Sequence, residues 1–345
     1  MKRVSIKDVA KEAGVSTSTI SYVLNNKESE SISPGTQQRV WAAVEKLGYV
    51  PNLNARSLIS RRSNLIGVII PQTEPGKEFM FSNPFYGEFL SSVEYTARRN
   101  GYHLLISGTE ANDGYLRIAR NRGVDGIILV GTYPSGFIEE LKQLSIPVVL
   151  VDAYIKDAYF HTIGIDDERG GYLATRYLLE RGHREIAFVS GIIKEHGVND
   201  KRYQGYRAAL QEAGIDPLAR RVYAGEVDYA YGIRAAQEMR ERGFAETAAI
   251  CTADILAVGL VKGVRAQGRR VPEDLSVMGF DDVYLAEICD PSLTTVRQDI
   301  RLKGERAVEL LLHAQEREER ETILLPISIV ERDSIKTLTK EEARE

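Results

Sequence analysis

Short hydrogen-bonding side chains, with no acidic residue among them, gather near the N-terminus between positions 17 and 25. Ile20, Val23 and Leu24 fall between them at helical spacing, so apolar residues face one side of a helix and polar ones the other. The outward residues are Thr17, Ser18, Ser21, Tyr22 and Asn25. Groups that both donate and accept hydrogen bonds can contact base edges in a DNA major groove. A helical hairpin with an ordinary polar surface remains the alternative.

A helix-turn-helix would present this polar row, and the residues upstream of it predict one. Apolar residues recur there at helical spacing, at Ile6, Val9, Ala10 and Ala13. Gly14 can adopt the positive φ of a tight turn, and Ser16 can cap the second helix. In such a pair the second helix enters the groove. Further DNA-contact candidates in this segment are Ser5, Ser16 and Thr19.

A third helix is predicted after residue 33. Ser33 caps it, Pro34 suits its first turn and Gly48 ends it. Its apolar stripe is Val40, Trp41, Val44 and Leu47. We therefore expect residues 1–48 to form a small all-α headpiece, with Trp41 in the core rather than serving as a base-stacking platform.

Residues 49–63 have the composition of a basic linker. Pro51 prevents the third helix from continuing, and Asn54 can cap one or two turns from which Leu58 projects. A helix this short is not stable alone. We predict a hinge helix whose Leu58 wedges into a minor groove, against the alternative of a plain linker with Leu58 packed on the next domain. The contact candidates here are Asn54, Ala55, Ser57 and Leu58.

The charge distribution separates the two ends of the chain. Residues 1–62 contain 10 Lys and Arg against 5 Asp and Glu, whereas the whole chain has a formal net charge of −4. A basic end on an acidic body is expected when only one domain meets phosphate. Binding to DNA through that end should weaken steeply with salt.

Short motifs follow one another in an order that is more specific than any one of them. Near the N-terminus they are residues 6–25, TQQRV at 36–40, LGYVPN at 47–52 and ARSL at 55–58. Further on they are IGVIIP at 66–71, SNPFY at 82–86, VDGII at 124–128, PVVLVD at 147–152, GHR at 182–184, RYQGY at 202–206, VMGFDD at 277–282 and LTTV at 293–296. In this order they resemble the lactose/galactose repressor (LacI/GalR) family of bacterial transcription regulators, over nearly the whole chain.

Composition is that of a globular protein, with 43% hydrophobic and 27% charged residues among 345. No apolar run approaches the roughly twenty residues that span a bilayer, and no signal peptide follows Lys2 and Arg3. Two cysteines, Cys251 and Cys289, exclude a disulfide framework and a tetrathiolate metal site. We expect a cytoplasmic protein without metal, cofactor or membrane partner.

The body, residues 64–330, alternates short β-branched strands with amphipathic helices, which predicts parallel sheets covered on both faces. About ten strands suggest two such sheets and hence two lobes. The resemblance implies a periplasmic-binding-protein-like core, with the chain crossing between lobes near 161–166, 291–298 and 322–327. Residues 331–345 are predicted to be a charged tail, without the apolar heptads of a tetramerising coiled coil.

Polar residues at strand ends are the candidates for ligand binding, because parallel sheets bind ligands beyond the carboxyl ends of their strands. Asp152, Asp254 and Asp281 each follow a strand, and Arg202 precedes a helix predicted over 205–213. Carboxylates accept paired hydroxyl groups and an arginine donates two bonds, which suits a sugar. The resemblance implies Arg202 and Asp281 as the main contacts, then Asp152, Asn83, Phe85 and Tyr86. For Asp152 and Asp254, a helix cap or an interdomain salt bridge is the alternative.

Two departures from the family pattern concern the ligand. Sugar-responsive members often carry an asparagine at the position of Ala253, and an aromatic residue that stacks on the sugar at the position of Val227. Phe79 or Phe81, in a longer segment between Pro71 and Asn83, is a candidate to replace that aromatic residue. Packing of this segment between the lobes is the alternative.

Enzymatic signatures are absent from the sequence: there is no phosphate-binding loop, G-x-S-x-G elbow or H-E-x-x-H motif. We predict a homodimeric repressor of carbohydrate-utilisation genes that binds a palindromic operator and responds to a sugar or oligosaccharide between its lobes. A regulator driven by a corepressor or partner protein is the runner-up; a solute-binding module or glycosidase is more distant. The sequence leaves open the effector, its direction of action, the operator and any assembly beyond the dimer.

Overall fold

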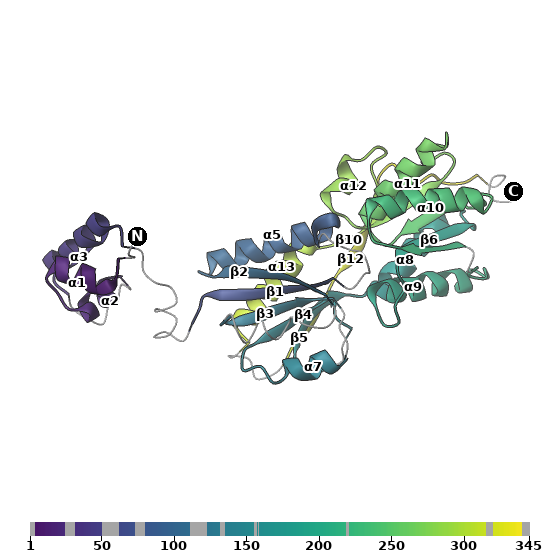
Figure 1. Cartoon of the computed structure of the whole chain (residues 1–345). Coiled ribbons are helices and arrows are strands. Elements are labelled where there is room, and N and C mark those ends of the chain that lie inside the picture. The colour runs from purple at the N-terminus through teal and green to yellow at the C-terminus, as the bar shows by residue number, and fades with distance from the viewer. Residues whose placement is uncertain are drawn as a thin grey trace. The chain divides into compact units, whose positions relative to one another are not determined.

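The computed structural model divides the chain into two compact units, residues 1–63 and 64–345 (Figure 1). It describes residues 4–24, 32–49, 62–72, 80–110, 123–131, 135–154, 157, 159–218, 221–314 and 320–339. Within these residues, no helix is both long and apolar enough to cross a membrane.

The first unit contains the three predicted helices: α1 (Ile6–Ala13), α2 (Thr17–Leu24) and α3 (Pro34–Leu47). Gly14 and Gly48 end α1 and α3 with φ of 64° and 57°, the left-handed conformation that glycine adopts without strain. Val9, Ile20 and Val40 are fully buried where the helices meet. These short helices are therefore held by one shared core.

Trp41 does not belong to that core, and the prediction that it does is wrong. Its side chain is 52% exposed. Val40 and Ala43 form the buried face of α3, with Val44 and Leu47 partly buried beside them. Because each residue turns a helix by about 100°, Trp41 points well away from the face that holds Val40.

The described part of the second unit contains two six-stranded sheets. The first has the order β11 (Thr322–Leu325), β5 (His161–Ile165), β4 (Val148–Val151), β3 (Gly126–Val130), β1 (Leu65–Gln72) and β2 (His103–Glu110). The second has the order β12 (Ile327–Val330), β10 (Thr294–Gln298), β9 (Ser276–Asp281), β8 (Ala248–Cys251), β6 (Ile186–Gly191) and β7 (Val222–Gly225). All neighbours are parallel except the β10–β12 pair at one edge.

Helices cover these sheets and define two lobes. The first lobe has the 3-10 turn Met80–Ser82, α5 (Pro84–Arg99), α7 (Ser135–Leu141) and α13 (Ile300–Leu312). The second has α8 (Asp167–Glu180), α9 (Val198–Glu212), α10 (Tyr229–Glu241), α11 (Asp254–Ala266) and α12 (Tyr284–Ile288). The chain passes between the sheets after β5, after β10 and between β11 and β12 (Figure 1). The two lobes are thus joined by three passages that bring strand ends from both sheets together.

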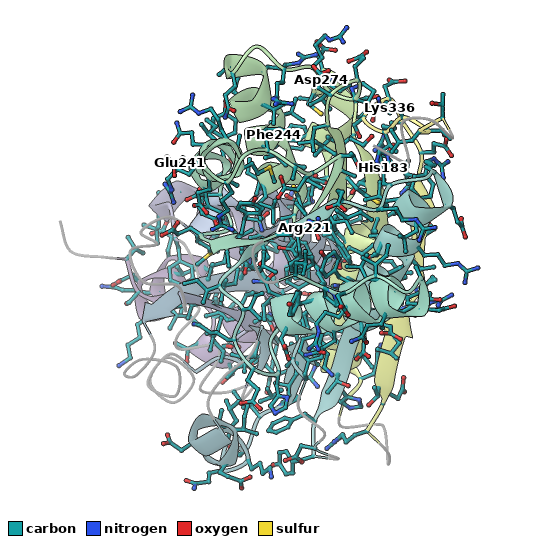
Figure 2. All side chains as sticks on the ribbon, turned by 90° about the vertical axis from the view of Figure 1, so that its right-hand side faces the viewer. His183, Arg221, Glu241, Phe244, Asp274 and Lys336 are labelled. Atoms are coloured by element: carbon teal, nitrogen blue, oxygen red, sulfur yellow. The ribbon has the colours of Figure 1, made fainter. Side chains whose placement is uncertain are left out.

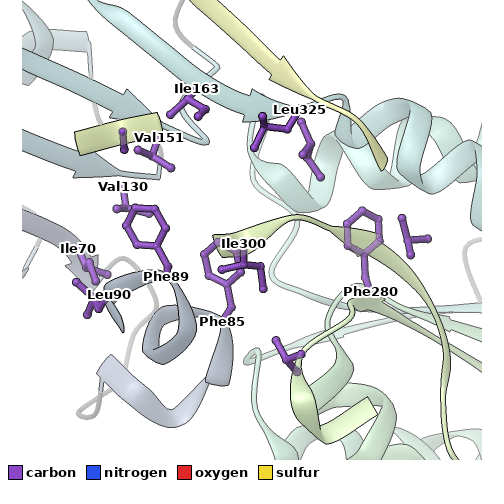
Figure 3. Packing of buried hydrophobic residues seen from close by; sticks show 14 of the residues in the cluster. Ile70, Phe85, Phe89, Leu90, Val130, Val151, Ile163, Phe280, Ile300 and Leu325 are labelled. Atoms are coloured by element: carbon purple, nitrogen blue, oxygen red, sulfur yellow. The ribbon is translucent and has the colours of Figure 1, made fainter. Parts of the chain in front are cut away.

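One hydrophobic cluster runs through both lobes. It includes Phe85 and Phe89 of α5 and Phe280 of β9, all at most 8% exposed. Figure 3 shows Ile300 beside Phe85, between α5 and the region of Phe280. Apolar side chains of both lobes belong to this one cluster. The two lobes are therefore in direct hydrophobic contact.

Residues 331–339, predicted as part of a charged tail, lie against the second lobe. Ser334 is fully buried and binds β9 and β10 through Val277 and Thr294. His183 is also buried, and its ring nitrogens lie 3.0 Å from Thr247 Oγ1 and 3.1 Å from the Lys336 carbonyl (Figure 2). This segment therefore belongs to the fold of the second lobe.

Candidate functional site

The polar face of α2 is the first candidate site. Thr17 and Ser18 are exposed, and Ser21 and Tyr22 are half-buried. The helix carries no acidic residue in its first turn and no basic residue in its last. It therefore offers hydroxyl groups, rather than charges, to a partner.

Other predicted DNA contacts in this unit have local roles. Ser16 Oγ caps α2 by accepting the Thr19 N–H at 3.1 Å, and it lies 2.9 Å from Thr19 Oγ1. Ser5 begins α1, donating its N–H and Oγ–H to Asp8 Oδ2 at 2.9 and 2.7 Å. Asn25, Asn54, Ala55, Ser57 and Leu58 lie outside the described residues.

The second candidate site lies between the lobes, where aspartates at strand ends have unusual backbone conformations. Asp152 follows β4 with φ of 52°, and Asp281 ends β9 with φ of 113°. Positive φ is costly for residues other than glycine and clusters at functional sites. The ends of one strand from each lobe are thus held in strained geometry beside carboxylates.

Arg202 and Asp281, the two main predicted ligand contacts, lie together. Arg202 Nη2 is 3.9 Å from Asp281 Oδ1, and the two residues are 6% and 3% exposed. Burial raises the pKa of Asp281 to about 7, against the lowering effect of the Arg202 charge and of a 2.6 Å hydrogen bond from Gln298 Nε2. Burial would lower the pKa of Arg202, but the charges of Asp167 and Asp281 raise it.

Arg202 lies inside α9 rather than before a helix, because α9 begins at Val198. Its guanidinium donates to Asp167 Oδ1 at 2.7 Å and to the Thr252 carbonyl at 2.5 Å. The guanidinium carbon also lies 3.5 Å from the centre of the Phe280 ring. The protein therefore fixes this arginine from three directions.

Asp152 is paired with Lys303, a residue that the sequence pattern did not single out. Lys303 Nζ is 2.7 and 2.9 Å from the two Asp152 oxygens, and 2.5 Å from Gln298 Oε1. Lys303 is fully buried and lies 5.4 Å from the Phe85 ring centre. Burial raises the pKa of Asp152, and the Lys303 charge opposes this shift.

Helical spacing was the signal that could have found Lys303. The buried residues of α13 are Ile300, Lys303, Gly304, Ala307, Val308, Leu310 and Leu311. A lysine at an inward position of such a stripe needs a buried counter-ion. Asp167 and Gln298, which were also missed, end or follow strands of the two sheets in the same way as the aspartates that were selected.

Asp254 does not cap α11, as the sequence suggested. Ala253 is the N-cap residue, and Asp254 is the first residue of the helix and fully buried. Its oxygens accept Thr295 Oγ1 at 2.7 Å and the Val283 N–H at 2.9 Å. Burial and then the Asp281 charge raise its pKa well above the usual value. Asp254 thus holds the turn that follows Asp281.

The remaining ligand candidates that the structure describes make local contacts, and Phe85 also lies beside Lys303. Asn83 caps α5 by accepting the Phe85 N–H at 3.0 Å, and Phe85 stacks on Phe89 and packs edge-on against Tyr86. Phe81 is 58% exposed, and Val227 packs against the core of the second lobe. Phe79 lies outside the described residues. Among the described residues, no group of three or more His, Cys, Asp or Glu could hold a metal ion.

Comparisons with known proteins match both units. Residues 5–52 match the profile of bacterial regulatory proteins of the lacI family, and residues 175–335 match a periplasmic binding protein-like domain. The chain is 36% identical to the HTH-type transcriptional repressor PurR of Vibrio atlanticus, over 97% of this chain and 99% of that protein. It is 34% identical to catabolite control protein A of Priestia megaterium, over 96% of this chain and 99% of that protein.

Solved structures agree with the fold. The Lac repressor dimer bound to operator and the anti-inducer ONPF has a TM-score of 0.83 and 28% identity, covering 97% of this chain and all of that chain. A complex of the transcriptional regulator CelR with cellobiose has a TM-score of 0.69 and 29% identity, covering 96% and 100%. By name, both proteins are regulators of transcription, and their structures share the fold described above.

Proposed function

The chain belongs to the lacI family of bacterial regulatory proteins and is a DNA-binding transcriptional repressor, and from this premise we propose that a carbohydrate between its two lobes controls its binding to DNA. The proposal has three parts: a sugar or oligosaccharide effector, a homodimer, and a palindromic operator contacted through α2 and the hinge. The genes under its control would then be carbohydrate-utilisation genes, and the repressor would act in the bacterial cytoplasm.

The observation that carries the effector proposal is the buried Arg202–Asp281 pair at the strand ends between the lobes. A sugar hydroxyl both donates and accepts, so it can bond a carboxylate and a guanidinium at once. Charge-assisted bonds of this kind are stronger than those between neutral groups. Phe85 and Phe280 lie beside Lys303 and Arg202 and give this polar cluster an apolar border.

Similar structures support a sugar-like effector. They include CelR with cellobiose, the Lac repressor with ONPF or ONPG, and a regulator from Enterococcus faecium with bound ribose. The Lac repressor on its operator is a dimer, which supports two headpieces on one symmetric site here. The basic headpiece adds a sequence-independent attraction to phosphate.

A regulator driven by a corepressor or partner protein is the second candidate. The observation that favours it is internal pairing: Arg202 is bonded to Asp167, and Asp152 to Lys303. Side chains that satisfy one another leave less for a small ligand to bond. One of the relatives is named for catabolite control, which is consistent with this candidate.

The proposal is tested with full-length protein in two steps. Selection from a random DNA library, followed by titration at several salt concentrations, should yield a palindromic site whose affinity falls with salt. A thermal-shift screen of mono- and disaccharides should then yield a compound that raises the melting temperature and changes affinity for that site. An operator without any responding sugar would contradict the effector proposal and favour the second candidate.

A further inference from the structure

Lys303 has all three of its N–H donors engaged inside the protein. An ammonium group has three donors and no acceptor. The Lys303 contacts with Asp152 Oδ1, Asp152 Oδ2 and Gln298 Oε1, at 2.7, 2.9 and 2.5 Å, use all three. Its side chain is fully buried. The protein itself thus supplies all the hydrogen-bond acceptors of the Lys303 ammonium group, which lies at the proposed effector site.

The partners of Lys303 come from both lobes. Asp152 follows β4 of the first sheet, and Gln298 ends β10 of the second. The Gln298 amide then donates to Asp281 at 2.6 Å. These four residues, which we call the lysine bridge, connect the strand ends of the two lobes through side chains alone.

A second side-chain connection runs beside the first. Tyr154, two residues after Asp152, donates its hydroxyl to Asp167, whose other oxygen accepts from Arg202 at 2.7 Å. In addition, Glu88 of α5 accepts the Tyr284 N–H of α12 at 3.0 Å. The lobes are therefore joined at several points by the protein's own groups.

We propose that the lysine bridge is an internal latch, with Lys303 as its central residue, that holds the two lobes together in the absence of effector. This inference rests on the proposed function only in treating the interlobe cluster as the effector site. The bond that crosses between the lobes is the one from Lys303 to Gln298. Breaking it would leave a fully buried ammonium group one acceptor short, which is costly, so the latch opposes separation of the lobes. An effector therefore has to replace these internal bonds, and can shift the lobes only through its different affinity for the two arrangements.

The test is small-angle X-ray scattering of the full-length protein without any added ligand. Lys303→Met removes the ammonium and keeps much of the side-chain volume. Gln298→Leu breaks the link between lobes while Lys303 keeps Asp152 and Asp281 keeps Arg202, so it is the variant less prone to misfold. Arg306→Met is the matched control, because Arg306 lies on the same helix and contacts Glu309 at the surface.

Both latch variants should shift to a larger radius of gyration than the wild type and Arg306→Met, at equal oligomeric state. If one of the two latch variants fails to fold, the other one decides. Equal radii of gyration for the wild type and the folded latch variants would overturn the latch. None of these readings depends on operator or sugar, so failure of the latch is distinguishable from failure of the proposed function.

Discussion

The Arg202 guanidinium donates to Asp167 Oδ1 at 2.7 Å, and both side chains are almost completely buried. The residue that the sequence most favours as an effector contact is therefore already paired within the protein. A ligand that binds Arg202 must either share it with Asp167 or displace that carboxylate. We therefore expect the proposed effector response to depend on the arginine and operator binding to be independent of it.

Arg202→Ala should abolish the effector response and leave operator affinity unchanged in the absence of effector. Moving occupancy from 99:1 to 1:99 needs about 5.5 kcal/mol of differential binding. Charge-assisted hydrogen bonds contribute about 1.5–3 kcal/mol each, so the bonds of one arginine supply much of that total. Operator affinity measured with and without the screened effector tests this, with neighbouring Lys201→Ala as control. A normal response in Arg202→Ala would contradict the proposed site.

Asp281 should make stability depend on pH. Burial raises its pKa to about 7, so the folded state keeps a proton that the unfolded chain releases near its ordinary value of 3.8. The stabilisation is full below that ordinary pKa and is lost as pH rises through 7. Asp281→Asn should flatten the decline in unfolding free energy between about pH 4 and pH 7. Some decline of the same sign should remain, because burial also raises the pKa of Asp152 and Asp254. Equal slopes in variant and wild type would contradict the assignment.

Local signals in the sequence were enough for the headpiece and most of the body. Ser16, Ser33 and Gly48 perform the capping roles predicted for them, because capping depends on residues within one turn of the helix end. Trp41 was misplaced because an apolar residue beside a stripe was taken as part of it.

Roles in the interlobe site depend on contacts that the sequence does not contain. Asp254 follows a strand and precedes a helix, the usual position of a cap, yet its partners are Thr295 and Val283, 41 and 29 residues away. The pairing of Asp152 with Lys303 joins residues 151 positions apart. The aspartates at strand ends could therefore be selected from the sequence, but the side chains that pair with them could not.

Gly205→Ala should destabilise the second lobe. A Cβ at Gly205 would lie 1.9 Å from the Glu168 carbonyl oxygen, because α8 and α9 pack backbone to backbone. Relief requires the helices to move apart, and overpacking of this kind costs about 1–3 kcal/mol. Denaturant unfolding measures the change. Gly87→Ala on α5, where a Cβ meets nothing within 4 Å, should instead be neutral or stabilising by up to about 1 kcal/mol. A Gly205→Ala variant as stable as the wild type would contradict the close packing of α8 and α9.

Ile288→Asp should convert the proposed dimer into a monomer. The dimer contacts expected from the sequence, through helices such as 85–98 and 253–264, stay a prediction. The apolar residues Leu256, Leu260 and Val264 of the second of these helices are buried within the subunit. Exposed apolar groups occur instead on α12, where Tyr284 and Ile288 are 58% and 69% exposed and four residues apart on one face. Tyr95 of α5 is 42% exposed, and α5 contacts α12 through Glu88.

Sedimentation of full-length protein measures this assembly. Ile192→Asp, at an isoleucine that is 39% exposed after β6, serves as the control and should stay dimeric. A dimeric Ile288→Asp variant would place the interface elsewhere. A monomeric wild type would contradict the dimer itself.

Leu58→Ala should weaken operator binding several-fold or more and leave effector binding intact. Leu58 lies outside the described residues, so this prediction rests on the sequence of the hinge. The hydroxyl groups of Thr17 and Ser18 discriminate bases less sharply than arginine or asparagine forks. Specificity then has to come in part from opening a base step, which an apolar wedge can do at the centre of a symmetric site. Titration of variant and wild type on the selected operator tests the wedge, with Thr17→Ala as a comparison that should change base preference more than overall affinity. An unchanged affinity for Leu58→Ala would leave the hinge as a plain linker between headpiece and body.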